Sequence, residues 1–254
     1  MKFDELDDRM RVFETAHDLC VLPGLYMVAR LDGRSFTRLT KEVHPFETPF
    51  DARFRDLMLA TAEHLMTDCG FNIAYGYTQS DEISLLFALA ENGFGRKLRK
   101  LISLLSGEAS AKFSLLLGAV AVFDCRISQL PSVDLVVDYL RWRSEDAHRN
   151  ALNAHGYWLL RNQGKTVGEA TAAMKGLSVA QKNELLFQNG VNFNDLPLWQ
   201  KRGSGLYWEE YERPAESPVT GEKVVARRKR VRRDLELPMK DDYSAFLRKL
   251  LSPS

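Results

Sequence analysis

The chain has 254 residues, 45% of them hydrophobic, and a formal net charge of +1. This length and apolar content suffice for one large domain or for a catalytic domain with an appendage. The near-neutral charge excludes a generally basic nucleic-acid-binding protein, so any cations that bind phosphate must be concentrated in particular segments.

The first half of the chain predicts strands and helices in a βαββαβ order. Short apolar runs bounded by turn residues are typical of strands, and apolar residues at helical spacing separate them. The predicted elements are a strand at 25–31, a helix at 51–69, strands at 71–77 and 83–89, a helix at 95–117 and a strand at 118–126. This is the order of the ferredoxin-like split βαβ, on which polymerase palms and nucleotide cyclases are built.

The second half predicts a helical region and then a hairpin. A long helix is expected at 133–161 and a turn at 214–221. Residues 223–233 hold seven cations among eleven residues, with valines that favour a strand. We predict an α+β fold: a polymerase-palm-like (ferredoxin-like βαββαβ) core with added helices and a C-terminal β-hairpin. A boundary near Pro131 gives a palm-like catalytic domain at 1–130 and a second region at 131–254 packed on it.

The start of the chain and its cysteines indicate the compartment. The first eight residues are too acidic for a signal peptide, and no apolar run reaches the roughly 20 residues of a membrane span. Cys20, Cys69 and Cys125 are odd in number and lack metal-ligand spacing. We therefore expect a cytoplasmic protein with no membrane segment, no zinc and no disulfide.

Two acidic motifs lie beside predicted strands. Asp32 follows the first strand, and Asp81-Glu82 lies between the two strands of a predicted hairpin. Either motif alone is most simply a turn. Because the βαββαβ order makes these elements neighbours, the carboxylates together favour a site for a pair of Mg²⁺ ions that supports nucleotidyl transfer.

Five motifs carry a more specific signal. They are Arg-Leu-Asp-Gly-Arg-Ser-Phe at 30–36, Tyr-Gly-Tyr-Thr-Gln-Ser-Asp-Glu at 75–82, Phe-Asp-Cys-Arg at 123–126, Asp-Ala-His-Arg-Asn at 146–150 and Lys-Asn-Glu-Leu-Leu-Phe at 182–187. Their order and spacing, from about Phe13 to Gly205, resemble the tRNA-His guanylyltransferase family. The Tyr-Thr-Gln before Ser-Asp-Glu resembles its bacterial and archaeal branch, whose members are 3′-to-5′ polymerases that repair tRNA 5′ ends.

The resemblance implies roles for the matched positions. Asp32 and Asp81 match catalytic carboxylates that bridge two metals, Gly33 matches a carbonyl ligand, and Glu82 matches an acidic catalytic neighbour that supports the site. The matched nucleotide-binding positions are Gly33, Arg34, Ser35, Phe36 and Thr37 in one loop, with Ser80, Arg96, Lys97, Lys100 and Arg126. The positions expected to contact tRNA or to serve the activation step are His148, Asn150, Lys182, Asn183, Arg227, Arg228 and Arg230.

The implied function is a 3′-to-5′ nucleotidyltransferase that adds nucleotides from GTP to the 5′ end of tRNA. The resemblance implies that ATP activates the 5′-monophosphate, that two Mg²⁺ ions are the cofactors, and that the tRNA acceptor end is the partner. Relatives form tetramers, so we expect a homo-oligomer.

Departures from the eukaryotic pattern affect the expected substrate. Ala151 and Ala154 replace two asparagines of its His-Ile-Asn-Asn-Leu-Tyr-Asn motif. Thr37 replaces a histidine, and Thr48 stands near the position where eukaryotic members have a lysine. We therefore expect template-directed repair of truncated tRNAs instead of strict tRNA-His selection. The alternatives are a palm-fold nucleotide cyclase-like enzyme and a non-catalytic RNA-binding protein.

Overall fold

An antiparallel sheet forms the centre of the molecule in a computed structural model that describes residues 2–216 and 223–252. Within these residues the strand order is β4-β1-β3-β2-β5-β6. The strands are β1 (Tyr26–Gly33), β2 (Ile73–Gln79), β3 (Glu82–Phe87), β4 (Phe123–Leu130), β5 (Ser204–Glu216) and β6 (Lys223–Asp234).

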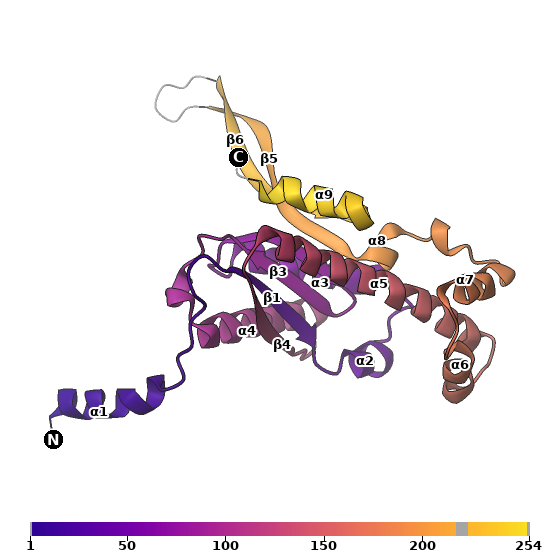
Figure 1. The fold of residues 1–254 in the computed structure, drawn as a ribbon, viewed down its shortest axis with the longest axis horizontal. Coiled ribbons are helices and arrows are strands. Elements are labelled where there is room, and N and C mark those ends of the chain that lie inside the picture. Colours follow the sequence, from indigo (N-terminus) through magenta and orange to yellow (C-terminus); the bar gives the residue numbers. More distant parts are fainter. Residues whose placement is uncertain (1, 217–222, 253–254) are drawn as a thin grey trace.

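Helices surround this sheet and extend beyond it. They are α1 (Phe3–Thr15), α2 (Phe36–Arg38), α3 (Ala52–Thr67), α4 (Leu98–Leu117), α5 (Val133–Asn162), α6 (Val167–Met174), α7 (Val179–Gln188), α8 (Leu198–Arg202) and α9 (Lys240–Leu251), with short helical turns η1 (Leu39–Val43), η2 (Gly93–Arg96) and η3 (Phe193–Asp195). Helix α1 projects from one end of the body, while α6 and α7 lie at the other end (Figure 1). Among the described helices, none has the length and apolar character needed to cross a bilayer.

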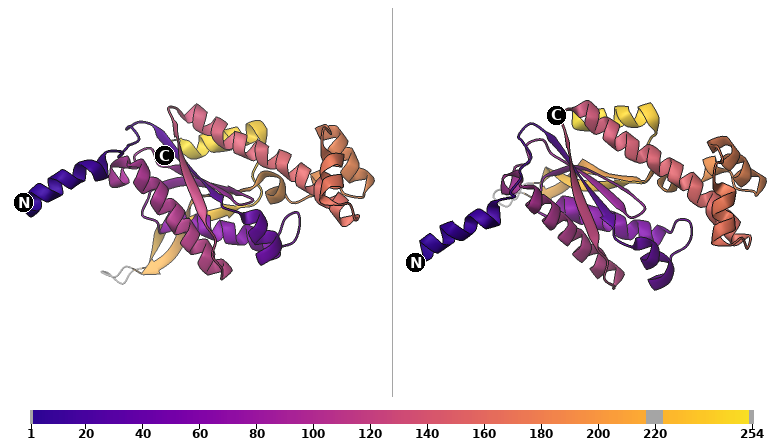
Figure 2. Two further views of the ribbon diagram at one scale, coloured as in Figure 1. Left: turned by 90° about the horizontal axis from the view of Figure 1, so that it is seen from below. Right: turned by 60° about the horizontal axis from the view of Figure 1, so that its bottom comes forward.

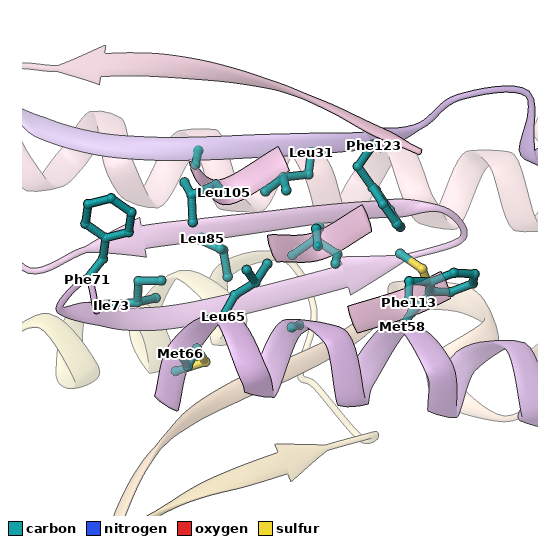
Figure 3. Close-up of a cluster of buried hydrophobic side chains, with 14 of the residues drawn as sticks. Leu31, Met58, Leu65, Met66, Phe71, Ile73, Leu85, Leu105, Phe113 and Phe123 are labelled. Atoms are coloured by element: carbon teal, nitrogen blue, oxygen red, sulfur yellow. The ribbon is translucent and has the colours of Figure 1, made fainter. Parts of the chain in front are cut away.

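The two faces of the sheet are covered by different helices, α3 and α4 on one side and α5 and α9 on the other (Figure 2). On the first side, Leu31 and Leu85 point from the strands into a cluster that includes Leu65 of α3 and Phe113 of α4 (Figure 3). Because side chains alternate along a strand, the neighbours of Leu31 project toward α5. Arg30 and Asp32 therefore face the α5 side.

The predicted α+β fold with a βαββαβ core is confirmed, and the observed element starts differ most from the predicted ones in α4 and β4. Helix α4 begins at Leu98 instead of residue 95 because Phe94, Gly95 and Arg96 have φ values of 52°, 60° and 59°, which a right-handed helix cannot contain. Strand β4 begins five residues after the predicted start at Gly118. That glycine ends α4 with a φ of 75°, and pairing with β1 runs only from Phe123 onward.

The C-terminal region is more integrated with the core than predicted. The hairpin of β5 and β6 is present, but β5 also pairs with β2, so the hairpin continues the central sheet. Most of its predicted turn, at residues 217–221, lies outside the described residues. The sequence reasoning missed α9, although Tyr243, Leu247 and Leu250 have helical spacing, and the first two are fully buried beside α5. The division at residue 131 stays a prediction.

Candidate active site

Asp32 and Asp81 come together at one end of the sheet. Asp32 pairs with Glu82 across β1 and β3, and Asp81 lies in the two-residue turn that joins β2 to β3. Ser80, the other turn residue, has a φ of 52°, and the Gly33 N–H donates to the Asp81 carbonyl at 3.0 Å. This hydrogen bond ties the turn to the end of β1, so the two carboxylates are held on adjoining segments.

The electrostatics of this pair favour a bound cation. Burial raises the pKa of Asp81, and the charge of Asp32 raises it further. A cation between the carboxylates would offset that repulsion. The described residues contain no cluster of three or more His, Cys, Asp or Glu side chains that could hold a metal. Mg²⁺, however, is commonly bound by one or two carboxylates, with water and phosphate oxygens completing its shell, so Asp32, Asp81 and the Gly33 carbonyl fit it.

Two arginines approach Asp32. The Arg30 Nε and an Arg126 Nη each lie 3.2 Å from the same Asp32 oxygen, Oδ2. Arg126, predicted to contact a triphosphate, thus lies beside the carboxylate pair. The sequence reasoning assigned no role to Arg30, although its position two residues before Asp32 puts both side chains on the same strand face.

Glu82 is held from α5. The Arg143 Nε donates to Glu82 Oε1 at 2.8 Å and an Arg143 Nη donates to Oε2 at 2.7 Å, a forked ion pair between buried side chains. Burial raises the pKa of Glu82, and the Arg143 charge opposes that rise. Sequence reasoning missed Arg143. The one local sequence signal for a role of Arg143 is its spacing from Asp146, three residues later on the same face of the helix, which predicts an ion pair.

Two cavities meet at the turn that carries Asp81. The aromatic cavity, of about 220 Å³, is lined by residues that include Phe46, Phe50, Phe54, Trp158 and Trp199. The polar cavity, of about 270 Å³, is lined by Asp32, Glu82, Arg143, Asn150 and Ala154, among others. Both are bounded by Pro49, Phe50, Gln79, Ser80 and Asp81. Two molecules could therefore meet beside one carboxylate.

Comparison with known proteins decides the family. A family model described as tRNAHis guanylyltransferase matches residues 7–131, and one described as Thg1 C terminal domain matches residues 134–242. A tRNA(His) guanylyltransferase of Neurospora crassa is 37% identical over 201 residues, which cover 74% of this chain and 68% of that protein. The chain belongs to the tRNA(His) guanylyltransferase family. It is therefore a nucleotidyltransferase that acts in tRNA processing.

Solved structures agree with this assignment. The chain is similar to a bacterial tRNA(His) guanylyltransferase (Thg1)-like protein in complex with GTP, with a TM-score of 0.74 and 25% identity over 98% of this chain and 100% of the other. A structure of such a protein in complex with ATP has a TM-score of 0.75 and 26% identity over the same shares of the two chains.

The loop expected to hold a triphosphate in this family member is only partly available to a ligand. Phe36 is 3% exposed and packs against Phe123, so its side chain belongs to the core. A Cβ on Gly33 would lie 2.5 Å from the Phe36 ring, which explains the glycine. The Arg34 N–H already donates to the Val122 carbonyl at 2.8 Å. Arg34, Ser35 and Thr37 are exposed, and Thr37 lines the aromatic cavity.

Three predicted triphosphate contacts lie at the opposite end of β1. Arg96 is 4% exposed, and its guanidinium donates to the carbonyl of Leu25, immediately before β1, at 2.6 Å. Asp32 is seven residues further along the strand, roughly 20 Å away at the usual rise per residue. Lys97 bonds Asp18 at 2.7 Å, and Lys100 lies 5.6 Å from the Phe94 ring. Because α4 starts at this far end, these cations do not join the carboxylates within one chain.

The predicted tRNA and activation residues are dispersed. Asn150 lines the polar cavity and donates to Asp146 at 3.2 Å. The His148 ring packs against Phe193 at 5.3 Å, and burial, then the charge of Arg202, lower its pKa. Its buried Nδ1 has no hydrogen-bond partner within residues 2–216 and 223–252. Lys182 and Asn183 lie on α7, which packs on α5 through Leu186 beyond the end of the sheet (Figure 1).

The hairpin is less basic than its sequence suggests. Arg227 lies 3.6 Å from Glu212 and Arg230 lies 2.8 Å from Glu209, so carboxylates of β5 offset cations of β6. Arg228 pairs with Tyr211 in the strand register. Glutamates on the neighbouring strand therefore reduce the net positive charge of this surface.

Proposed function

We propose that this family member is a 3′-to-5′ nucleotidyltransferase that repairs truncated tRNAs by adding nucleotides to their 5′ ends. The observation that carries the proposal is the meeting of two cavities at the Ser80–Asp81 turn, beside the Asp32 and Asp81 carboxylates. A reaction between two nucleotides needs two adjoining sites and a cation site between them. Asp32, Asp81 and the Gly33 carbonyl would hold Mg²⁺ ions.

The aromatic cavity suits the incoming GTP. Trp158 and Trp199 offer flat surfaces on which a base can stack. Lys41 lies 5.2 Å from the Trp158 ring, and the Arg55 guanidinium lies 4.6 Å from the Trp199 ring. These cations, with the Ser80 hydroxyl at the mouth, would offset the charge of the phosphates. The bacterial relatives named above were solved with GTP and with ATP.

The polar cavity suits the 5′ end of tRNA. In the activation step, a 5′-phosphate oxygen attacks the α-phosphate of ATP and pyrophosphate leaves. In the transfer step, the 3′-hydroxyl of GTP attacks the activated 5′-phosphorus and AMP leaves. Bound Mg²⁺ supplies charge stabilisation on the attacking and leaving oxygens. The protein's own part is to bring the two nucleotides together across the Ser80–Asp81 turn and to keep them aligned.

The hairpin suits the body of the tRNA. Arg228, Arg230 and Arg232 alternate along β6 and so share one face, where Glu209 contacts two of them. Such a face would contact the phosphate backbone in a salt-sensitive way and would read shape more than sequence.

From resemblance and composition we also propose a homo-oligomeric assembly, a cytoplasmic location and a domain division at residue 131. His148, Lys182 and Asn183 are proposed to contact tRNA or to serve the activation step.

The test is an extension assay with a tRNA that lacks its first nucleotide and carries a labelled 5′-phosphate. With Mg²⁺, ATP and GTP, we expect a product one residue longer in which the label has become resistant to phosphatase. Asp81→Asn serves as the inactive control. No extension from either a 5′-monophosphate or a 5′-triphosphate would reject the proposal. Cyclisation of a nucleoside triphosphate would then favour the cyclase-like enzyme, and RNA binding without turnover would favour the binding protein.

The repair mode has its own test. Changing the tRNA base opposite the missing nucleotide, with all four triphosphates present, is expected to change the added nucleotide to its complement. Addition of G whatever the opposing base would reject template-directed repair and leave guanylate transfer in place.

A further inference from the structure

A continuous network links the two walls of the polar cavity. One wall is the sheet end with Asp32, and the other is α5 with Asn150. Arg30 bonds Asp32 at 3.2 Å and lies 3.8 Å from Glu82, and an Arg143 Nη lies 3.3 Å from Asp146. In order, the network consists of Asp32, Arg30, Glu82, Arg143, Asp146 and Asn150.

Within this network Glu82 has little capacity left for other partners. Its two oxygens each accept from Arg143, and the Ser84 hydroxyl lies 3.4 Å from Oε1. Glu82 and Arg143 are each 8% exposed. A carboxylate this fully engaged anchors other residues more readily than it binds a metal or transfers a proton.

Arg143 is the one member that joins the helix to the sheet. Its planar guanidinium makes two parallel hydrogen bonds to Glu82, a geometry that lysine cannot reproduce. A third contact reaches Asp146, whose Oδ2 also accepts from Asn150. Asn150 lies about two helical turns beyond Arg143. The Arg143–Glu82 ion pair therefore fixes both the rotation of α5 about its axis and the position of Asn150 along that axis.

We propose that Arg143 is a positioning residue for nucleotide transfer. Its forked ion pair with Glu82 fixes the position of α5, which forms one wall of the polar cavity, relative to Asp32 and Asp81. The RNA 5′ end in that cavity is thereby aligned with the attacking hydroxyl. This inference rests on the proposed function and adds to it the residue that aligns the two substrates.

The test compares Arg143→Gln, Arg143→Lys, Glu82→Gln and the double variant Glu82→Gln/Arg143→Gln. The substrate is a tRNA lacking its first nucleotide and carrying a 5′-triphosphate, which bypasses activation. Rates are divided by the folded fraction from thermal unfolding. Arg141→Gln is the matched control, because Arg141 is on the same helix and pairs with Glu145 and Asp241 away from both cavities.

Each Arg143 variant is expected to lose about 10- to 100-fold in kcat, as for other residues that orient a site through a neighbour. KM for GTP should stay within about twofold, since the aromatic cavity lies across the turn. The double variant should be no slower than Arg143→Gln, because the pair acts as a unit. Arg141→Gln should match the wild type.

Several results would overturn the inference. They are a wild-type kcat for Arg143→Lys, strictly additive losses in the double variant, a loss confined to KM for GTP, or a loss that disappears after correction for the folded fraction. If Arg143→Gln does not fold, the kcat values of Arg143→Lys and Glu82→Gln still test the inference. Failure of the wild-type protein to extend RNA would overturn the proposed function as well, whereas normal wild-type extension with active Arg143 variants would overturn this inference alone.

Discussion

Charged side chains gather at both ends of strand β1, but the two ends differ in how those charges are paired and in the space beside them. At the Leu25 end, Lys97 and Arg99 pair with Asp18 and lower its pKa to about 2. At the Asp32 end, burial and a neighbouring carboxylate raise the pKa of Asp81, and two cavities open beside it. A cluster of charged residues alone thus does not indicate a functional site. A functional site is indicated by a carboxylate that lacks a neutralising partner and lies next to a cavity for a ligand.

The largest effect that this comparison predicts is at Asp81. Asp81→Asn is expected to lower the transfer rate on the order of 1,000-fold, about 4 kcal/mol, by removing a metal ligand. The raised pKa means that the ionised carboxylate opposes folding at neutral pH, so the same change should raise the melting temperature. Single-turnover extension and thermal unfolding measure the two effects. A rate near that of the wild type would remove Asp81 from the site.

At the opposite end of β1, a change should affect folding and leave catalysis intact. Arg96→Ala is expected to lower the free energy of unfolding by about 3 kcal/mol, because it leaves a cavity and removes the donor to partly buried carbonyls such as that of Leu25. KM for GTP should not change, because KM does not depend on how much of the enzyme is folded. Denaturant unfolding and initial rates test this. A rise in KM with unchanged stability would support the sequence-based expectation that Arg96 contacts a triphosphate.

The aromatic cavity is the next test of the Asp32 end. Trp158→Ala is expected to raise KM for GTP about tenfold, equivalent to about 1.4 kcal/mol of lost stacking. Trp208→Ala is the matched control, since Trp208 is on the hairpin and its indole N–H donates to the Ile73 carbonyl. Equal effects of the two changes on KM would contradict a nucleotide site at Trp158.

The smallest predicted effect concerns pH and Asp18. Its pKa is about 2 in the folded protein and about 4 when unfolded, so its contribution to stability is present above about pH 4 and lost as the pH falls toward 2. Asp18→Asn should therefore flatten the stability profile across this window. Chemical unfolding at several pH values measures it. An unchanged slope would mean that the Lys97 and Arg99 contacts contribute nothing.

Some features of the site and the fold could be predicted from the sequence, and others could not. The proximity of Asp32 to the Asp81 turn followed from strand order, since in a split βαβ core the third strand lies between the first and the second and so pairs with the first. Helix α5 was predicted to begin at Val133, as observed, and to end one residue before its observed end at Asn162, because apolar residues recur at helical spacing along it. The burial of Arg96 could not be predicted from the sequence, because three consecutive left-handed residues delay the start of α4 and turn its side chain into the protein.

The sequence by itself determined the family, the order of core elements and the two carboxylates, because strand alternation and helix spacing are local and the motifs that carry the resemblance can be read directly along the chain. Only the tertiary structure decided which cations stand beside those carboxylates, how glutamates of β5 offset arginines of β6, and how Arg143 reaches Glu82 across 61 residues. These contacts depend on strand register and on the direction in which helices cross the sheet. Both are set by packing of the whole core, so short sequence patterns could not predict them.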